Sequence, residues 1–338
     1  MDGKKLSIKQ IAELAGVSVA TISRVMNQKG GYTTETEQKV LSVIKEHHYI
    51  PNLVAKGLRT NMTRIIGLIV PDIVNEFFAK MVLDIQMELF QYGYLTMVCN
   101  VNESDKLEHQ LVKALVAQNI SGLILISGRT RKMTVKNLPT IYIDRRPNEE
   151  EIQDNMVIIE SDNVSGGYLA TKELIDCKCK KIGFITDYIG ESSKITRYEG
   201  YCKAIMEAKL SINPSLTLKV ETVSVEDAFN VVIKGMDMGL EVDGIVCSTD
   251  LLAIGAILAL KSRGYRVPED IKVTGFDDVS IASLFQPSIT TIHQYSDKMA
   301  KLVSDLMVEL IDGNVIEEKH RIVPVTLVKR ESTRNDQE

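Results

Sequence analysis

The sequence predicts an α/β protein with an N-terminal helix-turn-helix head, a hinge helix and two doubly wound parallel-sheet lobes of the periplasmic-binding-protein type. Residues 1–50 carry three short helical patterns, whereas from about residue 63 onward short β-rich runs alternate with amphipathic helices. A chain of 338 residues is also too long for one ordinary core. We therefore expect a head over 1–50, a hinge helix and linker over 51–62, and a two-lobed effector-binding and dimerisation domain over 63–338.

The composition is that of a globular protein, with 44% hydrophobic and 25% charged residues. The longest apolar run, Leu251–Leu260, is about half as long as a membrane span requires. The N-terminus has no apolar stretch typical of a secretory signal. The five cysteines lack the CxxC spacing of zinc or redox sites. We expect a cytoplasmic protein with reduced thiols and no membrane partner.

The charge is unevenly distributed along the chain. Residues 1–64 carry ten Lys and Arg against five Asp and Glu, so the remaining residues account for a net charge of −10 within the total of −5. A basic head on an acidic body is the asymmetry expected when only the head meets phosphate. Charge alone fits an ordinary solvated face equally well, so the motifs decide between these interpretations.

Three short helices are predicted in the head. Ser7 can cap the first helix, and Gly16 ends it in a left-handed conformation. Ser18 can cap a second helix that runs to about Asn27. The segment Thr34–Glu37 has the spacing of a capping box for the third helix.

The turn between the first two helices has the small and aliphatic residues of a helix-turn-helix: Ala12, Gly16, Val17 and Ile22. The second helix of that motif enters the major groove by its N-terminal residues. We expect four side chains to project outward: Val19, Ala20, Ser23 and Arg24. Arg24 can make a bidentate base contact, and Thr21 or Ser23 can hold phosphates. A three-helix interaction module without a DNA role is the alternative.

The segment after the head predicts a helix that forms only on binding. Pro51 suits a helix start, and Asn52–Arg59 make barely two turns, which is too short for stability in isolation. Gly57 weakens the helix further, by about 1 kcal/mol relative to Ala. An ordinary flexible linker would not explain an apolar Leu58 in this basic octapeptide.

Seven runs in the remainder of the chain are candidate strands: 65–70, 95–100, 122–127, 140–144, 181–186, 244–248 and 272–276. Such near-continuous apolar runs are typical of buried parallel sheets. No GxGxxG or GxxxxGK[ST] motif follows them, which disfavours a nucleotide-binding enzyme. Polar residues follow several strands, at the edge where doubly wound sheets bind ligands: Asp72, Asn75, Asp144, Arg145, Asp250, Asp277 and Asp278. Each alone could be a helix cap or turn residue.

The segment IKQIAELAGVSVATISRVMN resembles the N-terminal signature of the LacI/GalR family, and YIPNLVAKGLR (49–59) resembles the family's hinge helix. The resemblance implies that Val19 and Ala20 are paired specificity positions and that paired hinges each insert Leu58 into the minor groove, kinking the DNA. The DNA-binding residues expected on this basis are Ser18, Val19, Ala20, Thr21, Ser23, Arg24, Asn27, Asn52, Ala55 and Leu58.

Motifs in the body are similar to the family's effector domain and to periplasmic ribose-type sugar-binding proteins: DNVSGGYLAT, TRYEGY, STDLLAIGA, GFDD and TTIHQ. The resemblance implies that two rings flank a sugar while polar groups bind its hydroxyls. The effector-binding residues expected are Asn75, Phe77, Phe78, Asp144, Arg145, Arg197, Thr249, Asp277 and Gln294. Two positions depart from the pattern: Thr249 replaces a frequent Asn, and Val223 replaces a frequent stacking aromatic residue. An Arg197–Asp277 salt bridge that only ties loops together is the alternative to a ligand role.

These features predict a sequence-specific transcription regulator, acting as a repressor, that controls carbohydrate-related genes in response to a small sugar-like effector. Its expected partners are double-stranded DNA with a pseudo-palindromic operator and a second copy of the chain in a homodimer, with a tetramer as the alternative assembly. We expect no enzyme activity, no cofactor and no metal, since the five histidines are scattered. The alternatives are a regulator with a phosphorylated protein corepressor, a stand-alone solute-binding protein, and an enzyme on a doubly wound fold.

Overall fold

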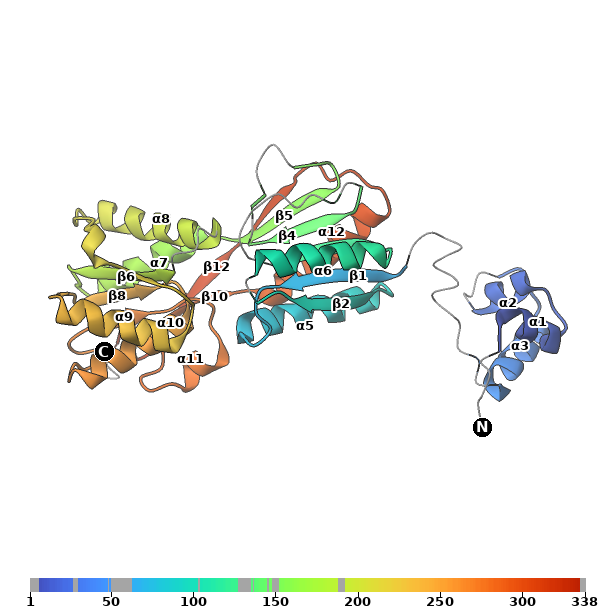
Figure 1. Ribbon diagram of the computed structural model, residues 1–338, viewed down its shortest axis with the longest axis horizontal. Coiled ribbons are helices and arrows are strands. Elements are labelled where there is room, and N and C mark those ends of the chain that lie inside the picture. The colour runs from blue at the N-terminus through green and yellow to red at the C-terminus, as the bar shows by residue number, and fades with distance from the viewer. Residues whose placement is uncertain are drawn as a thin grey trace. The chain divides into compact units, whose positions relative to one another are not determined.

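The computed structural model describes residues 6–26, 30–47, 49, 63–102, 104–126, 135, 137–144, 146–147, 152–187 and 192–334. The chain divides into two compact units, Met1–Thr63 and Arg64–Glu338, which we call the head and the body (Figure 1). The predicted hinge helix lies outside the described residues.

The head contains three helices: α1 (Ile8–Ala15), α2 (Val19–Met26) and α3 (Thr34–Glu46). Ser7 begins α1 through a capping box with Gln10, and Gly16 ends it at a φ of 61°. The helices bury one small core, to which each contributes: Ile11, Ala12, Ala15, Ile22, Val25 and Val40.

The predicted capping box at Thr34–Glu37 is wrong by one residue. Thr33 is the N-cap of α3, and its hydroxyl accepts a hydrogen bond from the Thr36 amide at 3.2 Å. Because Thr36 then stands at the third helical position, no Glu side chain reaches back to the cap. Glu35 and Glu37 lie in the first turn instead, where negative charge favours the helix dipole.

The first lobe of the body has a six-stranded sheet in the order β11-β5-β4-β3-β1-β2, with every neighbouring pair parallel. Its strands are β1 (Ile65–Val70), β2 (Leu95–Asn100), β3 (Gly122–Ile126), β4 (Thr140–Ile143), β5 (Met156–Ser161) and β11 (His320–Val323). Its helices are α5 (Glu76–Gln91), α6 (Asp105–Ala117) and α12 (Ser296–Ile311). Strands β3, β4 and β5 are buried along their whole length, as expected for a sheet covered on both faces.

The second lobe has a parallel four-stranded sheet in the order β7-β6-β8-β9. Its strands are β6 (Ile182–Asp187), β7 (Thr217–Val220), β8 (Gly244–Cys247) and β9 (Lys272–Thr274). Its helices are α7 (Asn163–Asp176), α8 (Ser192–Glu207), α9 (Val225–Asp237), α10 (Asp250–Ser262), α11 (Ser280–Leu284) and the short 3-10 helix η2 (Pro214–Leu216). The apolar run Leu251–Leu260 forms most of α10, and most of its apolar side chains are buried in the core of this lobe.

The lobes are joined by a two-stranded antiparallel ribbon of β10 (Thr291–Gln294) and β12 (Val325–Val328) (Figure 1). The chain enters the second lobe after β5, returns to the first lobe after β10, and crosses again from β11 to β12. Segments far apart in the sequence therefore meet at the junction of the lobes. In the described part of the chain, no helix is both long and apolar enough to cross a membrane.

Candidate functional site

The second helix of the head, α2, has one buried face and one exposed face. Ser18 caps it by accepting a hydrogen bond from the Thr21 amide at 3.1 Å. Ile22 and Val25 are buried, whereas Ala20 and Arg24 are exposed. This arrangement leaves Ala20 and Arg24 free to reach a partner.

The remaining predicted DNA contacts are half-buried or lie outside the described residues. Val19 does not project freely outward as predicted: it is half-buried and packs against the head core, and Thr21 and Ser23 are also half-buried. Asn27, Asn52, Ala55 and Leu58 lie outside the described residues.

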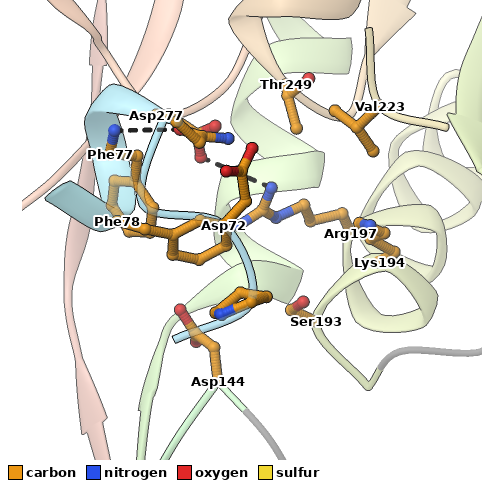
Figure 2. Close-up of a pocket in the computed structure, with 12 residues that line it drawn as sticks. Asp72, Phe77, Phe78, Asp144, Ser193, Lys194, Arg197, Val223, Thr249 and Asp277 are labelled. Carbon is orange, nitrogen blue, oxygen red and sulfur yellow. Dashed lines mark hydrogen bonds and ion pairs between the residues drawn. The ribbon is translucent and has the colours of Figure 1, made fainter. Parts of the chain in front are cut away.

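A pocket in the body is lined by residues of both lobes (Figure 2). The free space within it is about 60 Å³. Its lining is Pro71, Asp72, Asn75, Phe77, Phe78, Asp144, Ser193, Lys194, Arg197, Val223, Thr249 and Asp277. Several of these residues directly follow the carboxyl ends of β1, β4, β8 and β9, which is where doubly wound sheets bind ligands.

The first lobe contributes two aromatic rings from the start of α5. Asn75 is the N-cap of that helix and accepts a hydrogen bond from the Phe77 amide at 3.0 Å. The rings of Phe77 and Phe78 lie edge to face, with centroids 5.5 Å apart. Figure 2 shows them on one side of the pocket, with Arg197 and Lys194 on the other.

The position of Arg197 depends on a close crossing of α7 and α8. A Cβ atom at Gly167 would lie 2.0 Å from the Arg197 carbonyl oxygen, and one at Gly200 would lie 2.1 Å from the Val164 carbonyl oxygen. Only glycine at these positions lets the two backbones approach so closely. The close packing of the segments SGGY (165–168) and YEGY (198–201) therefore places Arg197 at the pocket.

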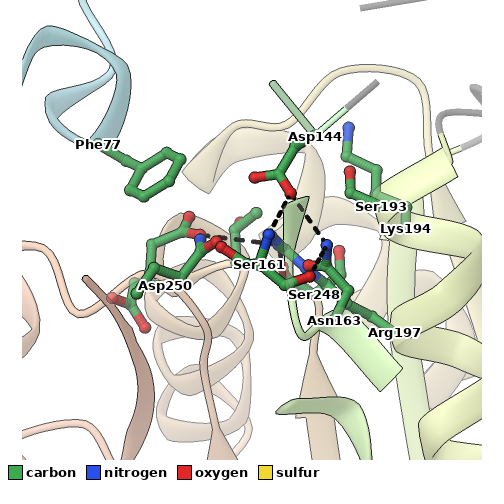
Figure 3. Close-up of polar contacts among 12 residues, drawn as sticks. Phe77, Asp144, Ser161, Asn163, Ser193, Lys194, Arg197, Ser248 and Asp250 are labelled. Atoms are coloured by element: carbon green, nitrogen blue, oxygen red, sulfur yellow. Dashed lines mark hydrogen bonds and ion pairs between the residues drawn. The ribbon is translucent and has the colours of Figure 1, made fainter. Parts of the chain in front are cut away.

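The guanidinium of Arg197 is held on several sides (Figure 3). Nε donates to Asn163 Oδ1 at 2.8 Å, and Nη1 donates to the Ser248 carbonyl at 2.6 Å. The centroid of the Phe276 ring lies 3.6 Å from the guanidinium carbon, within the range of a cation–π contact. These contacts fix the side chain before any ligand binds.

Asp144 presents a buried carboxylate at the end of β4. Its backbone has a φ of 48°, and Oδ1 accepts hydrogen bonds from the Ser161 amide at 2.9 Å and from Asn163 Nδ2 at 3.1 Å. Burial raises the pKa of the Asp144 carboxyl to about 6, and the positive charge of Arg197 limits the rise. The Asn163 amide thus connects Asp144 to Arg197.

Asp277 is the second buried carboxylate of the pocket. Oδ1 accepts a hydrogen bond from Gln294 Nε2 at 2.7 Å, and Arg197 Nη1 lies 3.7 Å from the same oxygen. Burial raises the pKa of Asp277 to about 7; Arg197 and Gln294 oppose the rise, and the charge of Asp144 adds to it. This site therefore holds an acid that titrates near neutral pH.

The structure brings most of the predicted effector residues together. Among them, the pocket lining includes Asn75, Phe77, Phe78, Asp144, Arg197, Thr249 and Asp277. Gln294 does not line the pocket, because β10 places it behind Asp277, where it is 3% exposed. Arg145 lies outside the described residues.

Sequence reasoning missed Ser193 and Lys194. Both lie on α8, four and three residues before Arg197, so they share its helix face. That spacing is the signal that could have revealed them. Lys194 Nζ pairs with the buried carboxylate of Asp187 at the wall of the pocket.

Comparisons with known proteins agree with this architecture. Residues 7–52 match the model of bacterial regulatory proteins of the lacI family, and residues 171–333 match a periplasmic binding protein-like domain. The HTH-type transcriptional repressor PurR of Haemophilus influenzae (strain PittEE) is 34% identical over 312 residues, which cover 90% of this chain and 91% of the relative. The ribose operon repressor of Halalkalibacterium halodurans is 31% identical and covers 97% of each chain.

A solved structure shares the complete architecture. The lac repressor dimer bound to operator and the anti-inducer ONPF superimposes with a TM-score of 0.85 at 25% identity, covering 98% of this chain and 99% of that one. The chain therefore belongs to the LacI family of bacterial regulatory proteins, and it is a DNA-binding transcription regulator with a periplasmic-binding-protein-like effector domain, not an enzyme.

Proposed function

We propose that this regulator is a cytoplasmic repressor that binds a near-palindromic operator as a homodimer, and that a small neutral sugar in the cleft of the body changes its DNA affinity. The names of the two relatives support this proposal, because both are repressors and one of them is a ribose operon repressor. So does the presence of a helix-turn-helix head and a two-lobed body in one chain. A single head contacts too little DNA to be specific, which favours a symmetric pair.

The observation that carries the sugar assignment is the division of the pocket into an apolar and a polar side. The Phe77 and Phe78 rings come from the first lobe, whereas Arg197, Thr249 and Asp277 come from the second lobe. A sugar presents C–H faces to aromatic rings and hydroxyls to carboxylates and guanidinium groups. The ligand would therefore contact both lobes at once.

The charge of the pocket favours a neutral sugar over a sugar acid or sugar phosphate. Its lining has three carboxylates, Asp72, Asp144 and Asp277, and two cations, Lys194 and Arg197. Lys194 also pairs with Asp187, so it provides no surplus positive charge. An anionic ligand would meet net repulsion wherever these carboxylates are charged, which for Asp277 is above about pH 7.

A purine base is the second candidate ligand. The two aromatic rings that suit a sugar can also stack on a planar heterocycle, and Asp277 can accept hydrogen bonds from its N–H groups. The absence of a stacking ring at Val223, on the second lobe, favours the sugar instead, since a flat base gains more from rings on both sides.

An apolar surface on the first lobe supports homodimer formation. Leu83, Met87 and Phe90 form a stripe along α5 and are 55%, 57% and 63% exposed. Leu95 and Met97, on the adjoining outer strand β2, are 49% and 39% exposed. Such a patch is unusual on a monomer, and a second copy of the chain would cover it.

A thermal-shift screen of neutral sugars, sugar acids, sugar phosphates and purine bases against the full chain tests the ligand assignment. A ligand that binds the native state raises the melting temperature in proportion to the logarithm of its concentration above Kd. We expect a neutral sugar to produce the largest shift. A shift by purines alone would replace the sugar with the second candidate.

A further inference from the structure

The two lobes of the body are directly connected by Glu76 and Ser280. Glu76 is the first residue of α5 in the first lobe, and Ser280 is the first residue of α11 in the second lobe. Glu76 Oε1 accepts a hydrogen bond from the Ser280 amide, and Oε2 accepts one from the Ser280 hydroxyl, each at 2.8 Å. Both carboxylate oxygens are thus engaged by one residue of the opposite lobe.

Helix α11 depends on this carboxylate for its capping. Val279 stands at the N-cap and makes no side-chain capping hydrogen bond. The amides of a first helical turn need an acceptor and favour negative charge. Glu76 supplies both from the other lobe, and the Val279 side chain packs into the hydrophobic core of the first lobe together with Phe77.

The residues of this contact adjoin the ligand pocket on each side. Phe77, next to Glu76, contributes a ring to the pocket, and Asp277, three residues before Ser280, contributes its carboxylate. Asp278 lies between Asp277 and Ser280 in the sequence. Its carboxylate contacts His293 Nδ1 of β10 at 2.8 Å and Arg330 Nη2, two residues after β12, at 2.6 Å. The segment Asp277–Ser280 therefore links the pocket, the ribbon and the first lobe within four residues.

The pocket in this arrangement has little free space for a small-molecule ligand. Its free space of about 60 Å³ compares with roughly 300 Å³ or more for typical small-molecule sites. Widening the cleft by moving the lobes apart would separate α5 from α11 and break both hydrogen bonds of Glu76. We propose that Glu76 and Ser280 form a latch that holds the lobes closed and positions Asp277 over the ligand. This role goes beyond the proposed function, since it applies whichever ligand the cleft takes.

Three substitutions test the latch. Glu76→Ala removes the acceptor. Ser280→Pro removes both donors, and proline suits the first position of a helix after a residue with the φ of −70° and ψ of 156° of Val279. Glu76→Gln is the rescue variant, because its amide can accept from the Ser280 N–H and donate to the Ser280 hydroxyl. Glu88→Ala, which removes another acidic residue of α5, is the matched control.

The measurement is the distance between the lobes in the full chain without ligand or DNA. Spin labels on noncanonical amino acids at exposed Lys106 and Glu226, one in each lobe, report it by pulsed electron spin resonance while the native cysteines stay in place. We expect Glu76→Ala and Ser280→Pro each to raise the ratio of open to closed molecules by about three- to tenfold. We expect Glu76→Gln and Glu88→Ala to match the wild type.

The double variant separates a latch from two unrelated effects. If Glu76 and Ser280 act as one contact, combining Glu76→Ala with Ser280→Pro should open the lobes no further than either change alone. If Ser280→Pro does not fold, Ser280→Ala, which loses one of the two hydrogen bonds, should give an intermediate shift. An unchanged distance distribution in Glu76→Ala, with faster amide exchange only at α11, would reduce the contact to a local helix cap and overturn the proposal. Because neither DNA nor ligand is present, this result is independent of the proposed function.

Discussion

Arg197 Nη1 and Asp277 Oδ1 lie 3.7 Å apart, which is an ion-pair distance but too long for a hydrogen bond. Arg197 donates instead to Asn163 and Ser248, and Asp277 accepts from Gln294. Both charged groups are therefore fixed by other partners. A carboxylate can accept about four hydrogen bonds, so Asp277 retains capacity for a ligand hydroxyl.

The first prediction concerns the dependence of stability on pH. The pKa of Asp277 rises from 3.8 in the unfolded chain to about 7 in the folded protein, so the folded state binds the extra proton. Its contribution to stability is complete below about pH 4 and is lost as the pH rises through 7. Asp277→Asn should abolish this loss and raise the free energy of unfolding at pH 8 by on the order of 1–3 kcal/mol, while weakening ligand binding.

Urea denaturation of wild type and Asp277→Asn at pH 5 and pH 8 measures this difference. Asp270 is the matched control, because its side-chain hydrogen bond with Arg266 lowers its pKa to about 2 and gives the opposite sign. Asp270→Asn should not stabilise the protein at pH 8. Equal gains for Asp277→Asn at the two pH values would show that Asp277 does not titrate in this range.

The second prediction concerns the glycine at the crossing of α7 and α8. Gly167→Ala places a Cβ atom against the Arg197 backbone, so α8 must move. We expect a loss of about 1–3 kcal/mol in the free energy of unfolding and a weaker thermal response to the ligand, because Arg197 moves with its helix. Lys172→Ala, at an exposed position of α7, is the control and should change stability by less than about 0.5 kcal/mol. Equal stability of both variants would mean that the crossing tolerates the extra methyl group.

Much of this site follows from the sequence because its carboxylates stand directly after buried strands. Asp144 and Asp277 follow the apolar runs of β4 and β9, so parallel-sheet geometry places each of them at the carboxyl edge of its own sheet, one in each lobe. Arg197, Phe77 and Phe78 were identified through the family resemblance. The role of Gln294 could not be predicted, because β10 pairs with β12, which lies more than thirty residues later.

The strands that the sequence analysis missed have a similar explanation. β11 pairs with β5 across about 160 residues, and the chain adds β11 to the first sheet only after it has returned from the second lobe. β7 is an outer strand with a half-buried pattern, so its apolar signal is weak. The Glu76–Ser280 contact spans 204 residues and has no local signature at all.

The third prediction concerns the homodimer. Phe90→Asp places a charge in the exposed apolar stripe of α5, where a partner chain would have to bury it. Sedimentation velocity should show a dimer for the wild type and a shift to monomer for the variant, with the unfolding of the head unaffected. Gln110→Asp, at an exposed position of α6 in the same lobe and away from the stripe of α5, is the control for added charge. A wild-type chain that sediments as a monomer at micromolar concentration would contradict the proposed assembly.

The fourth prediction separates base recognition from phosphate contacts. Arg24 is exposed on α2, so Arg24→Ala should reduce discrimination between a selected operator and random DNA by about 1–3 kcal/mol. Lys39→Ala, which removes an exposed cation of α3, should at most weaken binding to both DNAs equally. Fluorescence anisotropy at two salt concentrations measures both effects. Unchanged discrimination by the Arg24 variant would remove this residue from base readout.

The fifth prediction tests the central claim, that a ligand in the cleft of the body controls DNA binding by the head. The measurement is operator affinity of the full chain, with the operator selected from random duplexes, in the presence and absence of the sugar that gives the largest thermal shift. We predict that this sugar changes the operator affinity of the wild type at least tenfold and leaves that of Asp277→Asn unchanged, although both proteins bind the operator equally well without ligand. An operator affinity that stays the same in the wild type at saturating sugar would contradict the account.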